Sequence, residues 1–257
     1  MFHIYHKVNS NKTYGLIGKE ISHSFSPKYF KEKFKKENIR NCDYKLFSLN
    51  DIKEFKELLS NHSIQGLNVT IPYKQDIIPF LDKVDTLAKH IQAVNTIQFK
   101  NNKLIGYNTD VIGFEKSFKP LLKKYHKKAL VFGTGGASKA VVFVLEKLNI
   151  PYEFVSRTKT ELKYFDIDKN LLEEFQILIN TTPLGMFPKT KTCVDIDYNS
   201  ITDRHLAYDL VYNPLQTLFL VKSEKQGAFI KNGLEMLEIQ AEEAWKIWQK
   251  KDAIPKE

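Results

Sequence analysis

The sequence predicts an α/β protein, and two patterns support that prediction. Short apolar runs alternate with stretches whose apolar residues recur at helical spacing, beginning with 13–18, 28–38 and 44–48. This alternation indicates a parallel sheet covered by helices. The second pattern lies at 129–138, where an apolar run stops abruptly at a group of glycines. The length of 257 residues, 42% of them apolar, allows one large domain or two modest ones.

The first half of the chain is expected to alternate strands and helices. Pro27 suits the first turn of a helix, and Ser26 before it is a natural N-cap. Asn101 and Asn102 predict a turn between two strands. The expected strands cover 13–18, 44–48, 64–70, 93–97 and 104–107, and the expected helices cover 28–38, 50–60, 79–91 and 111–124.

The second half continues this pattern, with one irregular connection. A strand over 129–132, a helix to about Leu148 and a strand over 152–155 are expected first. Only about four residues then separate Thr158 from the apolar run 162–167, whereas a crossover between parallel strands takes a dozen or more. We therefore expect a shortened crossover, either without a helix or with 162–167 running in another direction. The remaining expected elements are strands ending at Asn180 and covering 207–212 and 227–232, and an amphipathic helix after Gly233.

Composition and charge exclude several classes of protein. The net charge of +9 raises the prospect of nucleic acid binding, but the lysines are spread along the chain and the densest groups have the spacing of solvated helix faces. We expect no nucleic acid partner, and a basic surface that attracts anionic small molecules. No apolar run reaches about eighteen residues, and 1–12 is too polar for a signal peptide, so we expect no membrane association or export.

The cysteines and histidines point to no metal site. Cys42 and Cys193 are solitary, which favours a reducing cytoplasm and offers neither a disulfide framework nor zinc spacing. His3 and His6 lack further ligands nearby. We therefore expect a cytoplasmic protein without a bound metal.

The glycine group predicts a turn from a strand into a helix that binds a dinucleotide. Gly133 would make the tight turn, and Gly135 would let backbone amides approach a pyrophosphate at the positive end of the helix. Ser138 stands where the general fingerprint has a third glycine. Such a turn also occurs without any ligand, so the glycines leave both interpretations open.

The next strand indicates which dinucleotide would bind. It ends at Ser156, Arg157, Thr158 and Lys159, and no acidic residue stands there to accept from a ribose 2′-hydroxyl. A guanidinium pairs with a phosphate in a bidentate fork, so this strand end favours the 2′-phosphate of NADP. The alternative is a solvated arginine at a strand end.

Polar side chains gather at the ends of several other expected strands. Ser22, Ser24 and Ser26 follow the first strand, and N-capping would explain only Ser26. Lys74 follows a strand that contains polar Asn68 and Thr70, and Asp110 begins a helix. Lys74 could simply face water, and Asp110 could be an N-cap. Together these groups have the composition of a polar active site.

These motifs, in this order, resemble those of the shikimate dehydrogenase family over nearly the whole chain. The matching segments are Ser24–Pro27, Asn68–Lys74, Ala93–Thr96, Gly106–Asp110, the glycine turn, Asn180–Gly185, Tyr208–Pro214 and Asn232–Ala241.

The resemblance implies a two-domain α/β enzyme that reduces 3-dehydroshikimate to shikimate with NADPH, on the way to chorismate and the aromatic amino acids. A substrate domain of residues 1–110 and 233–257 would enclose a Rossmann-like NADP-binding domain of residues 111–232. Ser24, Ser26, Thr70, Asn95 and Gln240 would hold the substrate, Asn68 and Tyr212 would line the cleft, and Lys74 and Asp110 would form the catalytic pair. The cofactor residues would be Gly133, Thr134, Gly135, Gly136, Ala137, Ser156, Arg157, Thr158, Lys159, Thr181, Thr182 and Gly233.

The chemistry of the pair agrees with that role, because a lysine ammonium can protonate the alkoxide that forms when hydride reaches a ketone. Ser156 departs from the family's usual asparagine, which would weaken one phosphate contact, and 1–12 precedes the expected first strand. Two alternatives stay open: a quinate/shikimate dehydrogenase that uses NAD, and a catalytically silent ligand-binding relative. The protein would act as a monomer or homodimer.

Overall fold

The computed structural model describes residues 12–61, 64–157 and 162–250. The chain divides into two compact units, Met1–Asn108 with Ala244–Glu257 as unit 1 and Thr109–Glu243 as unit 2. Each unit contains one β-sheet. The mixed α/β architecture with two domains confirms the predicted fold class.

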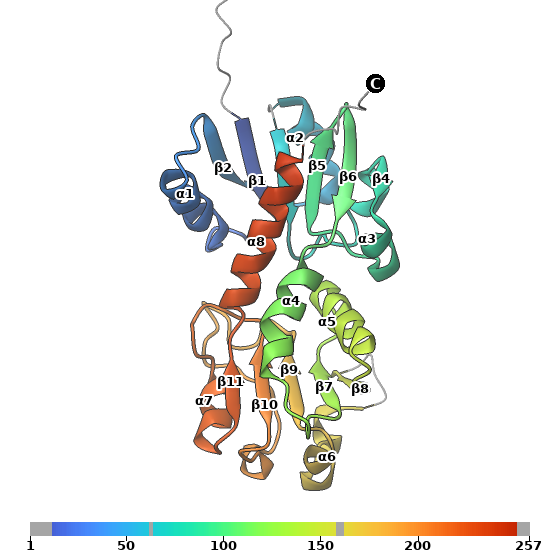
Figure 1. Cartoon of the computed structure of the whole chain (residues 1–257), viewed down its shortest axis with the longest axis vertical. Coiled ribbons are helices and arrows are strands. Elements are labelled where there is room, and N and C mark those ends of the chain that lie inside the picture. The colour runs from blue at the N-terminus through green and yellow to red at the C-terminus, as the bar shows by residue number, and fades with distance from the viewer. Residues whose placement is uncertain (1–11, 62–63, 158–161, 251–257) are drawn as a thin grey trace, which may run out of the picture. The chain divides into compact units, whose positions relative to one another are not determined.

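The sheet of unit 1 is mixed and has the strand order β2-β1-β3-β5-β6-β4 (Figure 1). The strands β2, β1 and β3 are parallel, whereas β5 is antiparallel to β3 and β6 is antiparallel to β5. The parallel pairing expected from the alternation is therefore confirmed for β1, β2 and β3, and β5 and β6 are the two strands that the predicted turn joins. Asn101 and Asn102 adopt φ values of 50° and 57° and return the chain in a two-residue turn. The strands are β1 (Lys12–Gly18), β2 (Cys42–Ser48), β3 (Ile64–Val69), β4 (Lys83–Val84), β5 (Thr96–Lys100) and β6 (Lys103–Tyr107).

Two helices of unit 1 are shorter than the sequence suggested, whereas α1 has the expected length and begins two residues earlier. They are α1 (Ser26–Lys36), α2 (Phe55–Asn61), which follows a 3₁₀ turn at Ile52–Glu54, and α3 (Thr86–Ile91). The helix expected over 79–91 is wrong in its first half, because 83–84 pairs with β6. The Asp85 carboxylate accepts a hydrogen bond from Leu87 N at 3.0 Å and so starts α3 at that point.

Ser26 is not the N-cap of α1. Phe25 occupies that position without a side-chain cap, and Ser26 is the first helical residue. The backbone N–H of Ser26 donates to Ser24 Oγ at 3.3 Å. The serine that assists the start of the helix is therefore Ser24.

The sheet of unit 2 is entirely parallel and has the order β11-β10-β9-β7-β8 (Figure 1). Its strands are β7 (Ala129–Phe132), β8 (Tyr152–Val155), β9 (Ile177–Asn180), β10 (Leu206–Asp209) and β11 (Phe229–Lys231). The helices are α4 (Asp110–Phe118), continued by a 3₁₀ turn at Lys119–Leu121, α5 (Gly136–Lys147), α6 (Lys169–Glu174) and α7 (Leu218–Lys225). The three central strands, β7, β9 and β10, are buried along their whole length, which suits a parallel sheet with both faces covered.

The connection from β8 to β9 contains a helix, α6, so the expected form that lacks a helix is wrong. Leu162 forms an isolated parallel bridge with Val155 beyond the end of β8. A 3₁₀ turn at Tyr164–Asp166 and the six residues of α6 are the helical segments described in this connection. A short helix is thus present, and 162–167 does not form a strand of the sheet.

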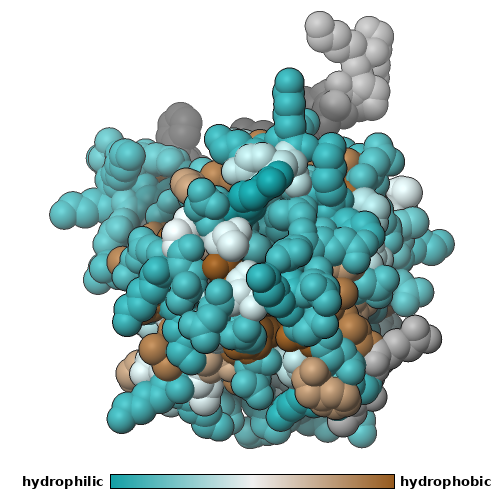
Figure 2. Space-filling model, turned by 90° about the horizontal axis from the view of Figure 1, so that it is seen from below, coloured by the Kyte–Doolittle hydropathy of each residue, from teal (hydrophilic) through white to brown (hydrophobic). Residues whose placement is uncertain are grey.

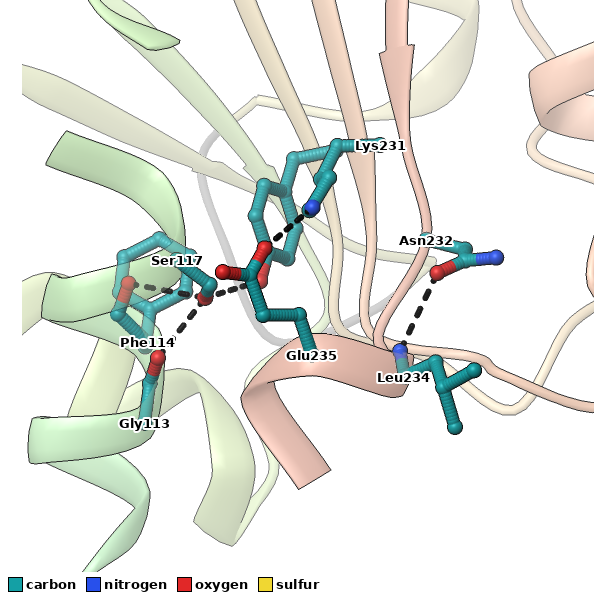
Figure 3. A network of polar contacts seen from close by, with 8 residues as sticks. Gly113, Phe114, Ser117, Lys231, Asn232, Leu234 and Glu235 are labelled. Carbon is teal, nitrogen blue, oxygen red and sulfur yellow. Dashed lines mark hydrogen bonds and ion pairs between the residues drawn. The ribbon is translucent and has the colours of Figure 1, made fainter. Parts of the chain in front are cut away.

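The helix α8 (Leu234–Gln249) begins in unit 2, and its residues from Ala244 onward belong to unit 1. Its first part lies against α4, because a Cβ on Gly113 would be 2.6 Å from Met236 O and 3.2 Å from Gln240 Cβ. Figure 3 shows the start of α8, where Asn232 Oδ1 accepts from Leu234 N at 3.2 Å. Residues 233–243, expected with the substrate domain, therefore cluster with unit 2.

Ser117 anchors α4 to the sheet of unit 2. Its Oγ donates to Gly113 O at 2.7 Å and lies 2.7 Å from Tyr208 Oη (Figure 3). Lys231 and Glu235 form an ion pair nearby, between β11 and the first turn of α8. These contacts fix the two helices that carry Asp110 and Gln240.

Each unit has its own apolar core. The core of unit 1 includes Ile17, Phe55 and Leu67, and that of unit 2 includes Leu130 and Phe219. The face drawn in Figure 2 is largely hydrophilic, with small separate apolar areas. Among the described residues no helix has the length and apolar character needed to cross a bilayer. The same residues contain no group of three or more metal-ligating side chains suited to an ion.

Candidate functional site

Four polar side chains form a connected network at the carboxyl end of β3. Tyr44 Oη donates to Asn68 Oδ1 at 2.8 Å. Asn68 Nδ2 donates to Asn95 O and to Thr96 Oγ1, both at 3.3 Å. Thr96 Oγ1 in turn donates to Asn95 Oδ1 at 3.1 Å. Both N–H groups of Asn68 are therefore used inside unit 1, and the network sets the orientation of the Asn95 amide.

The backbone that follows β3 places Lys74 at the carboxyl end of that strand. After β3 ends, Thr70 N donates to Ile17 O at 2.9 Å, and the chain then turns through 71–77. Val94 N donates to Lys74 O at 2.7 Å, which places the Lys74 backbone beside the residue preceding Asn95. Lys74 and Thr70 are both half-buried.

Ser24 lies in the segment between β1 and α1, and Ser26 is the first residue of α1. Their Oγ atoms are 3.4 Å apart, Ser24 is half-buried, and Ser26 is buried. Because β1 is the neighbour of β3 in a parallel pair, this segment starts at the same edge of the sheet as Thr70. Unit 1 thus gathers the serine pair, Thr70, Lys74 and Asn95 at one edge.

Asp110 and Gln240 both belong to unit 2, and Gln240 contacts Thr109, the residue before Asp110. Asp110 is the first residue of α4 and Thr109 is the N-cap, so Asp110 is not itself the cap. Thr109 Oγ1 donates to Gln240 Oε1 at 3.3 Å, and Gln240 Nε2 donates to Leu237 O at 3.0 Å. A carboxylate in the first turn is stabilised by the positive end of the helix dipole.

The glycine turn has the geometry expected of a phosphate-binding turn. Gly133 has a φ of 100°, and a Cβ there would lie 2.8 Å from Thr182 Cγ2, so glycine is required for both conformation and space. Gly135 is the N-cap of α5 and makes no side-chain cap. A Cβ on Gly135 would meet nothing within 4 Å. The space above the α5 amino terminus is open, which fits a pyrophosphate held by backbone N–H groups. Thr134 lies between the two glycines, and Gly136 and Ala137 are the first two residues of α5. Thr134 and Gly136 are half-buried.

The end of β8 is described only in part. Ser156 is buried and Arg157 is exposed, while Thr158 and Lys159 lie outside the described residues. Arg157 lines a pocket of about 530 Å³ together with Tyr164, Phe165 and Ile167. The Phe165 side chain is 87% exposed.

The aromatic lining of this pocket was not predicted. Tyr164 stacks on Phe132, the last residue of β7, with ring centroids 6.1 Å apart and planes inclined by 13°. The consecutive aromatic residues Tyr164 and Phe165 are visible in the sequence. The direction of their side chains, however, depends on how the connection between β8 and β9 folds. A guanidinium beside one exposed aromatic ring suits a phosphorylated adenosine, and Lys163, Asp195 and Asp197 also line the pocket.

Thr181 and Thr182 follow β9 and are bonded to the protein itself. Thr181 Oγ1 donates to Phe132 O at 2.7 Å. Thr182 Oγ1 donates to Asn180 Oδ1 at 2.6 Å and accepts from Leu184 N at 3.2 Å. The two hydroxyls therefore shape the loop beside the glycine turn.

Asp209, at the end of β10, is a buried carboxylate that the sequence analysis gave no role. It accepts hydrogen bonds from Asn180 Nδ2, Val211 N and Thr217 Oγ1. Burial raises the pKa of Asp209 to about 7, while the hydrogen bonds from Thr217, Val211 and Asn180 act to lower it. A polar residue ending an apolar strand was its only sequence signal.

Gly233 is required by close backbone packing. Its N–H donates to Val211 O at 3.1 Å, and a Cβ there would lie 2.1 Å from Leu210 O. Tyr212 follows Val211 and is half-buried. Unit 2 thus gathers the glycine turn and the loops after β8, β9 and β10 at the carboxyl edge of one parallel sheet, where such folds bind ligands.

Comparisons with known proteins identify relatives over most of the chain. The family model for the shikimate dehydrogenase substrate binding domain matches residues 16–97. The shikimate dehydrogenase (NADP(+)) of Methanosphaera stadtmanae is 37% identical, and the alignment covers 91% of this chain and 90% of that protein.

Solved structures agree with these matches. Shikimate dehydrogenase from Aquifex aeolicus is 35% identical with a TM-score of 0.81, covering 93% of this chain and 92% of that chain. Shikimate 5-dehydrogenase from Thermus thermophilus, solved in complex with NADP(H) and shikimate, is 26% identical with a TM-score of 0.81. That alignment covers 92% of this chain and 93% of the other.

Proposed function

The chain belongs to the shikimate dehydrogenase family, and we propose that it reduces 3-dehydroshikimate to shikimate with NADPH in a reversible reaction. The reaction lies on the pathway to chorismate and the aromatic amino acids. The observation that supports this most is the similarity to NADP-dependent shikimate dehydrogenases over about nine-tenths of a chain that contains Lys74 and Asp110.

The residues of unit 2 fit an NADP cofactor. The open space above Gly135 and the uncapped amino terminus of α5 suit the pyrophosphate, and Arg157 suits the 2′-phosphate. Gly133, Thr134, Gly136 and Ala137 would shape the phosphate turn, and Thr181, Thr182 and Gly233 would shape the neighbouring loops. Ser156, Thr158 and Lys159 would complete the phosphate site. When bound, NADPH supplies the hydride that reduces the ketone.

Lys74 is the proposed proton donor. Its ammonium would donate to the oxygen of the reacting carbonyl as negative charge develops there, and Asp110 would orient that ammonium and offset its charge. The buried network of Tyr44, Asn68 and Thr96 would hold Asn95 ready to bind the substrate. Preorganised polar groups of this kind need little rearrangement during the reaction.

The other substrate contacts are also proposals. Ser24, Ser26, Thr70, Asn95 and Gln240 would bind the hydroxyls and the carboxylate, while Asn68 and Tyr212 would line the site. Unit 1 would act as the substrate domain and the sheet of unit 2 as the cofactor domain, with α8 contributing Gln240. The partner is a small molecule, and the two solitary cysteines favour action in the cytoplasm.

The test is absorbance at the nicotinamide band with purified protein, comparing shikimate and quinate, each with NADP and with NAD. We expect reduction of the nucleotide with shikimate and NADP. Turnover with quinate would contradict the substrate specificity assigned to the serine pair. Turnover with NAD would contradict the cofactor specificity assigned to Arg157. Absence of turnover with all four pairs would overturn the proposed function.

A further inference from the structure

Asp209 is fully buried at the end of β10, and the proposed chemistry does not use it. Its two carboxylate oxygens receive three donors. Oδ1 accepts from Asn180 Nδ2 and from Val211 N, each at 2.9 Å. Oδ2 accepts from Thr217 Oγ1 at 2.5 Å. These donors come from the end of β9 and from the segment that follows β10, so one side chain connects two loops.

The first set of hydrogen bonds extends from Asp209 through Asn180 into the loop after β9. Because Asn180 Nδ2 faces Asp209, its Oδ1 faces the loop and accepts from Thr182 N at 3.0 Å and Thr182 Oγ1 at 2.6 Å. Thr182 Oγ1 then accepts from Leu184 N. The same Thr182 side chain sets the space available at Gly133, since a Cβ there would lie 2.8 Å from Thr182 Cγ2.

The second set of hydrogen bonds joins Asp209 to the segment 211–217, which contains Tyr212. Val211 begins this segment and Thr217 ends it, yet both donate to the carboxylate of Asp209. Thr217 is also the N-cap of α7. Asp209 therefore holds the two ends of the segment together and fixes the start of the helix that follows it.

The two loops meet beyond Asp209. Phe187 N donates to Asn213 O at 3.0 Å, and a Cβ on Gly185 would lie 3.0 Å from Thr217 Cβ. A change at the carboxylate therefore reaches Thr182 through Asn180 and reaches the 211–217 segment directly.

We propose that Asp209 is a positioning residue, which holds the loop after β9 and the 211–217 segment in the shape that binds the dinucleotide. It contacts neither reactant itself. An apolar residue could fill the same space but would leave Asn180, Val211 and Thr217 without their acceptor. This inference rests on the proposed function, because it assigns these loops to the NADP site.

The test measures the dissociation constant of NADP⁺ by calorimetric titration of the full chain, together with kcat and KM. Asp209→Asn keeps the shape but replaces one acceptor oxygen with a donor, and we expect the dissociation constant to rise about 10-fold. At saturating substrates kcat should change by less than about 3-fold, because no reacting group is altered.

A second pair of variants keeps the proposal testable if Asp209→Asn does not fold. Thr217→Ser retains the hydroxyl that Asp209 accepts, whereas Thr217→Val removes it at nearly the same size. We expect Thr217→Val to weaken NADP⁺ binding and Thr217→Ser to bind it as the unmodified protein does. Asp51→Asn is the control, because the exposed Asp51 caps a 3₁₀ turn of unit 1 by accepting from Lys53 N. Its NADP⁺ affinity should equal that of the unmodified protein.

Three results would overturn the proposal. NADP⁺ affinity equal to that of the unmodified protein in both Asp209→Asn and Thr217→Val would remove Asp209 from the site while leaving the proposed function intact. Equal loss in Thr217→Ser and Thr217→Val would show that the hydroxyl is not the cause. Failure of the unmodified protein to bind NADP⁺ would instead contradict the proposed function, and the inference with it.

Discussion

Units 1 and 2 both carry a buried polar network at the carboxyl end of their sheets, but the two networks differ in the groups that they contain. The network of unit 1 joins Tyr44, Asn68 and Asn95 through neutral hydrogen bonds. That of unit 2 is centred on the titratable carboxyl group of Asp209. A neutral hydrogen bond contributes about 1 kcal/mol, and one to a charged group about 1.5–3 kcal/mol.

Similar positions in two sheets can therefore be stabilised by groups that respond differently to pH and to substitution. A neutral network does not change with pH in the ordinary range, and losing one bond costs little. A buried carboxylate responds to both pH and substitution, because its charge must be stabilised by every donor around it. A substitution in unit 1 should therefore change either catalysis or the free energy of unfolding. A substitution at Asp209 in unit 2 should change both cofactor binding and the free energy of unfolding.

The largest effect should come from Lys74, in unit 1. Lys74→Ala removes the proposed proton donor, so we expect kcat to fall about 10²- to 10⁴-fold. The dissociation constant of NADPH should change little, since the cofactor residues belong to unit 2. Steady-state kinetics and a binding titration test both statements, and unimpaired turnover would refute the assignment.

The next largest effect should come from Arg157, in unit 2. Arg157→Ala removes the proposed charge-assisted contact to the 2′-phosphate, and we expect NADP⁺ to bind about 10- to 100-fold more weakly. Binding of NAD⁺ should be nearly unchanged because it lacks that phosphate. Arg204→Ala is a matched control, since Arg204 lies over the Tyr125 ring in the same unit. An equal loss for NAD⁺ would contradict the phosphate assignment.

The pH dependence of stability should distinguish the two networks. Burial raises the pKa of Asp209 to about 7, above the value of about 3.9 in an unfolded chain. Between these values the folded state binds the extra proton, so the free energy of unfolding should fall as pH rises from about 4 to about 7. The slope contributed by this group should approach about 1.4 kcal/mol per pH unit.

Urea unfolding of the unmodified protein and of Asp209→Asn at several pH values isolates that contribution. The stability of the unmodified protein relative to the variant should decline with rising pH across this window and be constant above it. A relative stability that grows with pH would show that the three donors outweigh burial and keep Asp209 ionised.

The smallest effect should come from Tyr44, in the neutral network. Tyr44→Phe keeps the ring stacked on Phe30, whose centroid is 4.3 Å away, but removes the bond to Asn68. We expect a loss of about 1 kcal/mol in the free energy of unfolding, and a modest rise in the KM for shikimate. Tyr107→Phe removes a comparable bond to Gln98 and should lower stability without changing that KM.

Much of the fold could be predicted because local patterns decide it. The apolar run of β7 followed by Gly133 and Gly135 predicted the strand, turn and helix correctly, and Arg157 does follow the end of β8. The helix expected over 79–91 failed because 83–84 pairs with β6, a contact distant in sequence. The parallel pairing expected in unit 1 holds for β1, β2 and β3, and the β5–β6 hairpin follows from its recognised turn residues.

The sequence by itself determined the family, because its motifs resemble those of one family over nearly the whole chain, and it supplied Lys74 and Asp110, the residues proposed for proton transfer. Only the tertiary structure decided which polar groups are already bonded within the protein. The Asn68 amide is taken up by Tyr44, Asn95 and Thr96, and Asp209 joins loops that are separate in sequence. Hydrogen bonds of this kind depend on distances between side chains of different strands, which only the packing of the sheet sets.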